Sequence, residues 1–213
     1  MINDILNSGS KELGISLSSK QFKDFTLLFD EINKWGTKIN ITALLKDKER
    51  LVEELFIDSM APLLYMRGRD LSDTKLLDIG SGGGFPGIPL QIAEPALKVT
   101  LSDSIEKKVF FIRHVIRKLG LKTAEAHCVR FGSPYLPSLD LNVFDWATSK
   151  AVTNILELST WALPYLKRGG KLICLKSPME APSVLPGYKD KEEYAYYLPF
   201  NRISRQLFIY EKI

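Results

Sequence analysis

The sequence predicts an α/β protein with a doubly wound, mainly parallel sheet and an N-terminal helical extension. From Lys75 onward, short apolar runs alternate with helical patterns, as in parallel strands joined by helices. Near the end, two β-rich runs over 193–199 and 206–211 follow each other with no helix between them. We expect these runs to pair as an antiparallel hairpin at the sheet edge, which gives seven strands with the five parallel ones.

Length, charge and cysteine content set the broad class. The 213 residues suit one medium domain, or an extension over 1–70 packed on a core over 71–213. The net charge of +4 permits a nucleic-acid partner without requiring one. Cys128 and Cys174 lie in apolar runs and are expected to be core thiols, so neither a disulfide nor a metal site is predicted. The N-terminus does not resemble a signal peptide, and no apolar run approaches about 18 residues, so we expect a cytoplasmic protein without membrane association. We also expect a monomer.

The first 70 residues read as helices. A short amphipathic helix over 1–14 is followed by a capping box, in which Gln21 stands three residues after Ser18. An apolar stripe then predicts a core-facing helix that breaks over 33–42; its members are Phe22, Phe25, Phe29, Ile32 and Trp35. A third helix over 47–66 must kink or end at Pro62. Asp58 in this helix is either a local cap or a group that faces a pocket.

The core is predicted as five strands over 75–80, 97–103, 123–129, 143–149 and 171–176. Helices are expected over 86–93, 104–119 and 154–166, with a proline-rich loop over 131–141. Ligands of such sheets collect beyond the carboxyl ends of the strands. The residues at these ends are Asp78, Asp103, Val129, Arg130, Ser149, Lys150 and Lys176. The outer face of the 104–119 helix is basic, and two interpretations stay open: a solvated surface, or a patch that tracks phosphates.

A glycine-rich stretch follows the first strand, with four glycines among residues 80–84. Glycines placed there let backbone approach a ligand closely. Read as Gly82-x-Gly84-x-x-Gly87, with Asp103 as the acid, the stretch fits a dinucleotide-binding fingerprint. Read as Asp78-x-Gly80-x-Gly82-x-Gly84, it resembles the first motif of S-adenosylmethionine-dependent methyltransferases. We favour the second register, because a carboxylate and the bulk of Phe85 suit a cofactor without phosphates better than a pyrophosphate.

Two longer segments narrow the resemblance. The stretch Gly80-Ser81-Gly82-Gly83-Gly84-Phe85-Pro86-Gly87-Ile88-Pro89-Leu90 and the segment Ser102-Asp103-Ser104-x-x-Lys107-Lys108 resemble the RsmG/GidB family of bacterial enzymes. This resemblance implies a Rossmann-like, seven-stranded methyltransferase fold and S-adenosylmethionine as the cofactor. It also implies methylation of the N7 of one guanine in small-subunit (16S) ribosomal RNA.

The resemblance assigns cofactor contacts to Gly80, Phe85 and the Val129-Arg130 pair. Together with Asp78, Gly82, Gly84 and Asp103, these residues make up the expected cofactor site, in which Asp103 binds the ribose hydroxyls. Three positions depart from the family pattern. Arg130 stands where an acid is usual, Lys150 replaces an arginine, and Phe56 replaces a histidine.

Chemistry at guanine N7 needs no general base, because this nitrogen already carries an in-plane lone pair. Accordingly, no catalytic base is predicted, and we expect catalysis to depend on alignment of the guanine with the methyl group and on exclusion of water. Lys150 is expected to bind guanine O6. Because A-form RNA hides N7 in its deep groove, the target should lie in a loop or be extruded, with Asn40, Asp58 and Lys176 as candidate rim residues. Each of these three also has a purely structural interpretation. A methyltransferase for another substrate and a nicotinamide-dependent oxidoreductase are the alternatives.

Overall fold

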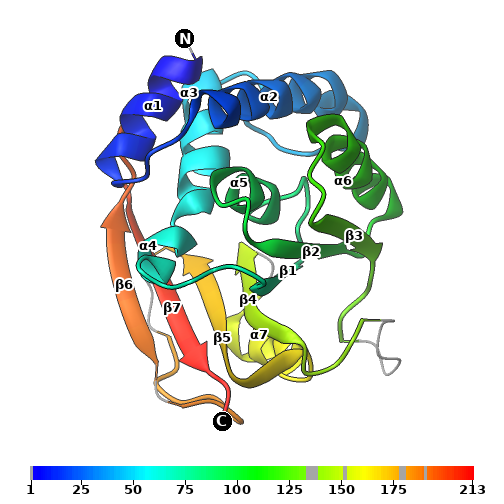
Figure 1. Cartoon of the computed structure of the whole chain (residues 1–213), viewed down its shortest axis with the longest axis vertical. Coiled ribbons are helices and arrows are strands. Elements are labelled where there is room, and N and C mark those ends of the chain that lie inside the picture. The colour runs from blue at the N-terminus through cyan, green and yellow to red at the C-terminus, as the bar shows by residue number, and fades with distance from the viewer. Residues whose placement is uncertain (1, 133–138, 151–152, 178–180, 190) are drawn as a thin grey trace.

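The computed structural model describes residues 2–132, 139–150, 153–177, 181–189 and 191–213, and these build a seven-stranded sheet in the order β3-β2-β1-β4-β5-β7-β6 (Figure 1). Five strands are parallel: β1 (Lys75–Ile79), β2 (Lys98–Asp103), β3 (Ala124–Cys128), β4 (Phe144–Lys150) and β5 (Leu166–Lys176). The hairpin of β6 (Glu192–Tyr197) and β7 (Ser204–Glu211) is antiparallel, and β7 pairs with β5. The predicted sheet is confirmed. Its strand order reverses between β1 and β4, which is where a crevice forms.

Helices cover both faces of this sheet. α5 (Gly87–Ala93) and α6 (Glu106–Leu119) pack on one face together with the N-terminal helices, and α7 (Ile155–Ala162) packs on the other (Figure 1). Alternation along β1 shows the two layers, since Leu76 belongs to the first hydrophobic cluster and Leu77 to the second. α7 is shorter than predicted, because Leu166 already belongs to β5. That strand continues through Gly169 and Gly170, beside an irregularity in its pairing with β4.

The N-terminal extension begins with α1 (Ile2–Glu12) and α2 (Ser19–Ile39). The capping box is confirmed: the Ser18 hydroxyl accepts from the Gln21 amide, and the Gln21 side chain accepts from the Ser18 amide. The predicted break over 33–42 is wrong, because α2 continues to Ile39 and ends at Asn40 in the left-handed conformation. Asn33 is accommodated by bonding its side-chain amide to the Phe29 carbonyl, and Gly36 by the close approach of Leu45.

The predicted third helix is divided into four short pieces. α3 (Lys48–Leu51) passes into a π-helical turn, η1 (Val52–Ile57), and then into a 3-10 turn, η2 (Asp58–Met60). α4 (Pro62–Met66) begins with its proline at the first helical position, where the missing N–H costs no hydrogen bond. The expected change of direction at Pro62 is therefore a junction between two helices.

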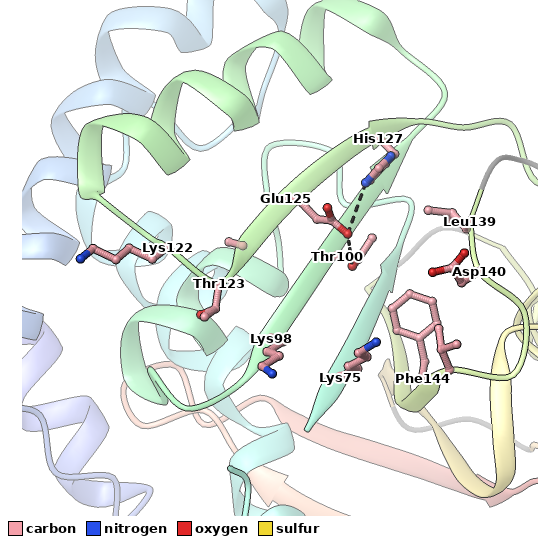
Figure 2. A pocket seen from close by; sticks show the side chains of 12 residues that line it. Lys75, Lys98, Thr100, Lys122, Thr123, Glu125, His127, Leu139, Asp140 and Phe144 are labelled. Atoms are coloured by element: carbon pink, nitrogen blue, oxygen red, sulfur yellow. Dashed lines mark hydrogen bonds and ion pairs between the residues drawn. The ribbon is translucent and has the colours of Figure 1, made fainter. Parts of the chain in front are cut away.

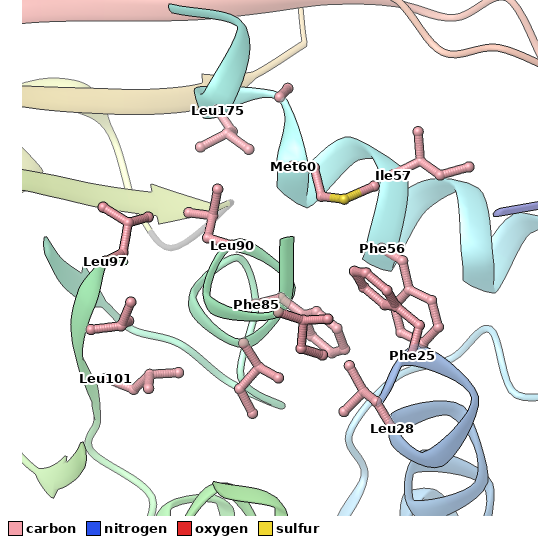
Figure 3. Close-up of a cluster of buried hydrophobic side chains, with 14 of the residues drawn as sticks. Phe25, Leu28, Phe56, Ile57, Met60, Phe85, Leu90, Leu97, Leu101 and Leu175 are labelled. Carbon is pink, nitrogen blue, oxygen red and sulfur yellow. The ribbon is translucent and has the colours of Figure 1, made fainter. Parts of the chain in front are cut away.

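Apolar side chains of the extension and of the sheet form one continuous cluster (Figure 3). Phe56 from η1 lies between Phe25 of α2 and Phe85 of the glycine-rich loop, with ring centroids 5.4 Å and 6.3 Å away. The phenyl group of Phe56 is thus fully buried. Packing of this kind fixes the extension directly against the loop that follows β1.

The two cysteines differ in their exposure to solvent. Cys174 is buried as predicted, but Cys128 is exposed, because it ends the edge strand β3.

The proline-rich loop over 131–141 falls mostly outside the described residues. Among the helices that the structure describes, none is both long enough and apolar enough to span a bilayer.

Candidate active site

A cavity of about 800 Å³ opens at the carboxyl ends of β1 to β4, at the point where the strand order reverses. It brings together six of the predicted site residues from four strands, namely Gly80, Gly82, Asp103, Val129, Arg130 and Lys150. Its other walls come from Ile79, Ser104, Ile105, Lys108, Phe131, Gly132, Glu157 and Trp161. A space of this size holds a ligand the size of a nucleoside derivative.

The loop between β1 and α5 is tied down by buried hydrogen bonds. Ser81 donates its hydroxyl proton to the Asp78 carbonyl and accepts from the Ser102 amide, while Ser102 donates to the same carbonyl at 2.7 Å. These bonds fasten the loop to both β1 and β2. The loop therefore presents a fixed backbone surface to the cavity.

The glycines of this loop serve different purposes. At Gly82, where φ is +57°, an added Cβ would meet no atom within 4 Å, so this position borders open space. At Gly83 a Cβ would lie 2.3 Å from Ile41, and at Gly84 it would lie 2.5 Å from Ile88. Gly82 is thus the position where a ligand can approach the backbone, whereas Gly83 and Gly84 permit close packing inside the protein.

Asp78 lies beneath the loop and not among the residues that line the cavity. Its Oδ2 accepts from the Gly87 amide at 2.8 Å, at the start of α5. Among the described residues no partner is recorded for its buried Oδ1. Burial raises the pKa of Asp78 to about 7, and the hydrogen bond from Gly87 opposes that rise. The structure shows that Asp78 holds the start of α5 through the hydrogen bond from the Gly87 amide. Direct contact between Asp78 and a cofactor stays a prediction.

Asp103 ends β2 and faces the cavity from the neighbouring strand. One carboxylate oxygen accepts from the Gly82 amide and the other from the Ile105 amide, both at 2.8 Å. Each oxygen has two lone pairs and so keeps capacity for a ligand hydroxyl. Asp103 therefore holds the glycine loop in place and can also bind a diol.

The next cluster joins the extension, the parallel sheet and the hairpin. Lys150 at the end of β4 places its ammonium 2.9 Å from Oδ2 of Asp58, and it also donates to the Glu54 carbonyl and, at 3.4 Å, to the Ser59 hydroxyl. On the other side of the carboxylate, Tyr196 donates its hydroxyl proton to Asp58 Oδ1 at 2.6 Å, and the Arg205 Nε lies 3.7 Å away.

Asp58 is therefore neither of the two things considered from the sequence. It is a buried anion enclosed by two cations and a phenol. Burial and the neighbouring carboxylate raise the pKa of Tyr196 well above its ordinary value, so this phenol stays a hydrogen-bond donor. We call Asp58, Lys150, Tyr196 and Arg205 the Asp58 cluster; only Lys150 of its members lines the cavity.

The remaining predicted site residues lie away from the cavity wall. Phe85 is buried in the hydrophobic core, and Gly84 packs against Ile88. Asn40 is the exposed C-cap of α2, although the neighbouring Ile41 contacts the loop at Gly83. Lys176 donates to the Thr153 carbonyl at 2.6 Å. Asn40 thus has the turn-stabilising position considered from the sequence, whereas Lys176 is half-buried and engaged by a carbonyl and does not simply face solvent. Ligand contacts by these four residues stay predictions.

Several cavity residues were not anticipated. Phe131 and Trp161 stack with centroids 6.1 Å apart, and both pack against the second hydrophobic cluster while lining the cavity. Ile105 is 40% exposed, directly after the serine that follows Asp103. An apolar residue two positions after a strand-end acid was the available signal, but the stacked pair depends on tertiary contacts that the sequence does not reveal.

A second cavity, of about 530 Å³, lies over the amino-terminal halves of the strands (Figure 2). Its floor is the polar side of β2 and β3, where Glu125 accepts from Thr100 and lies 3.4 Å from His127. Lys75, Lys98 and Lys122 surround it. It contains none of the predicted site residues and lies away from the carboxyl ends of the strands, so we place the active site in the first cavity.

Groups of three or more histidine, cysteine or acidic side chains arranged to hold a metal ion do not occur in the described part of the chain.

Comparison with solved structures identifies the fold. A SAM-dependent methyltransferase from Aquifex aeolicus superposes with a TM-score of 0.57 at 20% identity, covering 83% of this chain and 98% of that one. The [4+2]-cyclase SpnF superposes with a TM-score of 0.56 at 15% identity, covering 93% and 98%. These likenesses show a shared fold, that of the S-adenosylmethionine-dependent methyltransferases, without specifying a reaction.

Sequence comparison is more specific. The family model described as GidB, rRNA small subunit methyltransferase G, matches residues 21–190. The ribosomal RNA small subunit methyltransferase G of Geotalea uraniireducens is 38% identical, over 98% of this chain and 96% of its own length. Its counterpart in Alkaliphilus metalliredigens is 33% identical over 98% and 90%. These matches show that the chain belongs to the rRNA small subunit methyltransferase G family.

Proposed function

We propose that this protein transfers the methyl group of S-adenosylmethionine to the N7 of a guanine in small-subunit ribosomal RNA. The observation that carries the proposal is the cavity at the strand-order reversal, bordered by the open position at Gly82 and by Asp103. The family supplies the substrate class. The finer choice of N7 rests on the resemblance of the glycine-rich stretch to this family, and the roles of particular residues rest on the chemistry of the site.

The residues present suit the cofactor. Gly80 and Gly82 give an exposed backbone, Asp103 offers lone pairs to the ribose hydroxyls, and Ile105 and Val129 supply apolar wall for the adenine. When bound, S-adenosylmethionine supplies a methyl group activated by its sulfonium charge. Arg130 lines the cavity where the family usually has an acid, so the adenine contact must come from elsewhere in this wall.

Lys150 is the residue that we assign to the RNA base. Its ammonium has three protons, and Asp58, Glu54 and Ser59 accept them. The contact with Ser59, at 3.4 Å, is the weakest, and guanine O6 would take its place. N7 needs no base to accept a methyl group, so the protein's task is to hold the purine in line and exclude water.

The proposal also covers the location of the protein, its oligomeric state and the form of its RNA substrate. We propose a cytoplasmic monomer that meets its RNA in the small ribosomal subunit or as free RNA. Light scattering of the purified protein tests the monomer, and the reaction itself distinguishes the two RNA forms.

The decisive experiment incubates the protein with labelled S-adenosylmethionine and either intact small subunits or free rRNA, followed by mapping of the modified base. Lys150→Ala should lower methyl transfer strongly and leave S-adenosylhomocysteine affinity nearly unchanged. Lys150→Arg should restore part of the activity, because it keeps the charge but changes the donor geometry. Label that appears only in protein or in a small metabolite would overturn the proposal. A thermal shift with NAD but none with S-adenosylhomocysteine would overturn the cofactor assignment as well.

A further inference from the structure

The outer face of α6 carries an exposed aromatic ring among cations. Phe110 is 56% exposed. The helical period places Lys107 three residues before it, Arg113 three residues after it and Arg117 seven residues after it, all on the same exposed face. We call these four residues the α6 surface.

This charge is little neutralised within the protein. Among the described residues no ion pair is recorded for Lys107, Arg113 or Arg117, and the nearest acid on the helix is Glu106 in its first turn. The Arg113 Nε donates to the Ala126 carbonyl at 2.8 Å, which leaves its two terminal nitrogens for another acceptor. Several lysines on other elements are paired, for example Lys98 with Asp73 at 2.5 Å and Lys171 with Glu211 at 2.7 Å. The cations of the α6 surface are therefore available to an external anion.

The ring of Phe110 is held from behind by α2, which lies beside α6 (Figure 1). The Trp35 ring centroid is 6.1 Å from that of Phe110 and 5.4 Å from that of His114. His114 in turn bonds to the buried Glu31 at 2.7 Å, and Glu31 accepts from the Trp35 indole. One side of the phenyl ring is thus fixed by packing while the other faces outward.

The first turn of α6 reaches the rim of the active-site cavity, and Lys107, the first residue of the α6 surface, lies in that turn. Ile105 and Lys108, at the start of the same helix, line that cavity. With a rise of 1.5 Å per residue, Arg117 lies about 14 Å along the helix from Lys108. A polymer that enters the cavity with one unit can therefore follow the helix with its neighbours.

We propose that the α6 surface binds a single-stranded part of the substrate RNA next to the target guanine. Phe110 stacks on a base, and Lys107, Arg113 and Arg117 contact the backbone phosphates. An aromatic platform set among cations is the combination that single-stranded nucleic acids require. This inference rests on the proposed function and names the part of the surface that selects the RNA. Of the two interpretations that the sequence left open for this helix, the proposal takes the patch that tracks phosphates.

The test measures affinity for a small-subunit rRNA fragment at several salt concentrations. Phe110→Ala should weaken binding about tenfold with an unchanged salt slope, because stacking is lost but charge is kept. Phe110→Leu should weaken it similarly, and Phe110→Trp should retain it. Lys107→Gln combined with Arg117→Gln should reduce the slope of log affinity against log salt by about 1.4, since each phosphate contact contributes about 0.7.

Matched controls lie outside the α6 surface, on other elements. Lys23→Gln removes an exposed cation from the first half of α2, and Tyr197→Ala removes a 62% exposed ring from the edge strand β6. Both should bind RNA as the wild type does. Affinity for S-adenosylhomocysteine should stay unchanged in every variant, which shows that the fold and the cofactor cavity are intact.

Three results would overturn the inference. Full RNA affinity in Phe110→Ala and in the double variant rejects the surface, while the wild type still methylates RNA and the proposed function stands. Full affinity in Phe110→Leu rejects stacking. Normal binding of naked RNA with a loss confined to the assembled subunit assigns the surface to a ribosomal protein. If the wild type itself neither binds nor methylates RNA, the proposed function fails first.

Discussion

The glycine loop and the Asp58 cluster border the same cavity but are stabilised in different ways. In the loop, the carboxylates of Asp78 and Asp103 accept from backbone amides. In the cluster, Asp58 is held by side chains of Lys150, Tyr196 and Arg205, which come from three different strands. The first arrangement depends on the local chain path. The second depends on side-chain identity at distant positions, so the two should respond differently to substitution.

The largest expected effect concerns Asp78 and pH. Its pKa is about 7 in the folded protein and ordinarily 3.8, so the folded state binds the extra proton between these values. The contribution of Asp78 to the free energy of unfolding therefore falls as pH rises from about 4 to about 7, and is constant above. Asp78→Asn removes this dependence.

The measurement is denaturant unfolding of both proteins from pH 4 to pH 8. The free energy of unfolding of the variant minus that of the wild type should grow by up to about 4 kcal/mol across this window. A difference that does not change with pH would show that Asp78 titrates normally in the folded protein.

The second effect is a loss of stability when the Asp58 cluster is disrupted by substitution. Asp58→Ala leaves the Lys150 ammonium, whose side chain is 17% exposed, without its anion. Loss of one partner of a buried pair costs about 3–5 kcal/mol, and we expect the lower end because Glu54 and Ser59 still accept from Lys150. The double variant Asp58→Ala with Lys150→Met should recover part of the stability. A loss below about 1 kcal/mol in the single variant would mean that the cluster is solvated.

The third effect is a loss of cofactor affinity on substitution of Asp103, which tests whether this residue binds the ligand. Asp103→Ala should weaken S-adenosylhomocysteine binding by about 1.5–3 kcal/mol, as for a lost hydrogen bond to a charged group. Asp103→Asn should lose less, because one oxygen still accepts from Gly82 or Ile105. Calorimetry measures both, and unchanged affinity in Asp103→Ala would remove this residue from the cofactor site.

The smallest expected effect on stability concerns two adjacent glycines, Gly82 and Gly83. Gly82→Ala should cost about 1–2 kcal/mol of stability for its positive φ, and Gly82→Val should also abolish cofactor binding by filling the open space. Gly83→Ala instead drives a methyl group against Ile41, so it should displace the turn after α2 with less effect on cofactor affinity. Thermal unfolding with and without S-adenosylhomocysteine distinguishes these outcomes. Equal loss of ligand binding in both alanine variants would contradict the division of roles.

What the sequence predicted well has a local physical origin. The strand ends, the hairpin and the capping box each follow from neighbouring residues, and so does the turn that carries Gly82. The continuation of α2 past Asn33 was missed, because it depends on the packing of Leu45 against Gly36. The partners of Asp58 were missed for the same kind of reason, since Tyr196 lies 138 residues away along the chain.

The position of β7 between β5 and β6 has a consequence for the order in which the protein can fold during its own synthesis. β6 emerges before β7 but pairs only with it, so the edge of β5 stays open until residues 204–211 have been made. Asp58, made early, must wait until then for Arg205, and without β7 it also has no anchored β6 to present Tyr196. A nascent chain that lacks the last strand therefore exposes an unpaired strand edge and a carboxylate without its full set of partners, both of which are recognisable to chaperones and proteases.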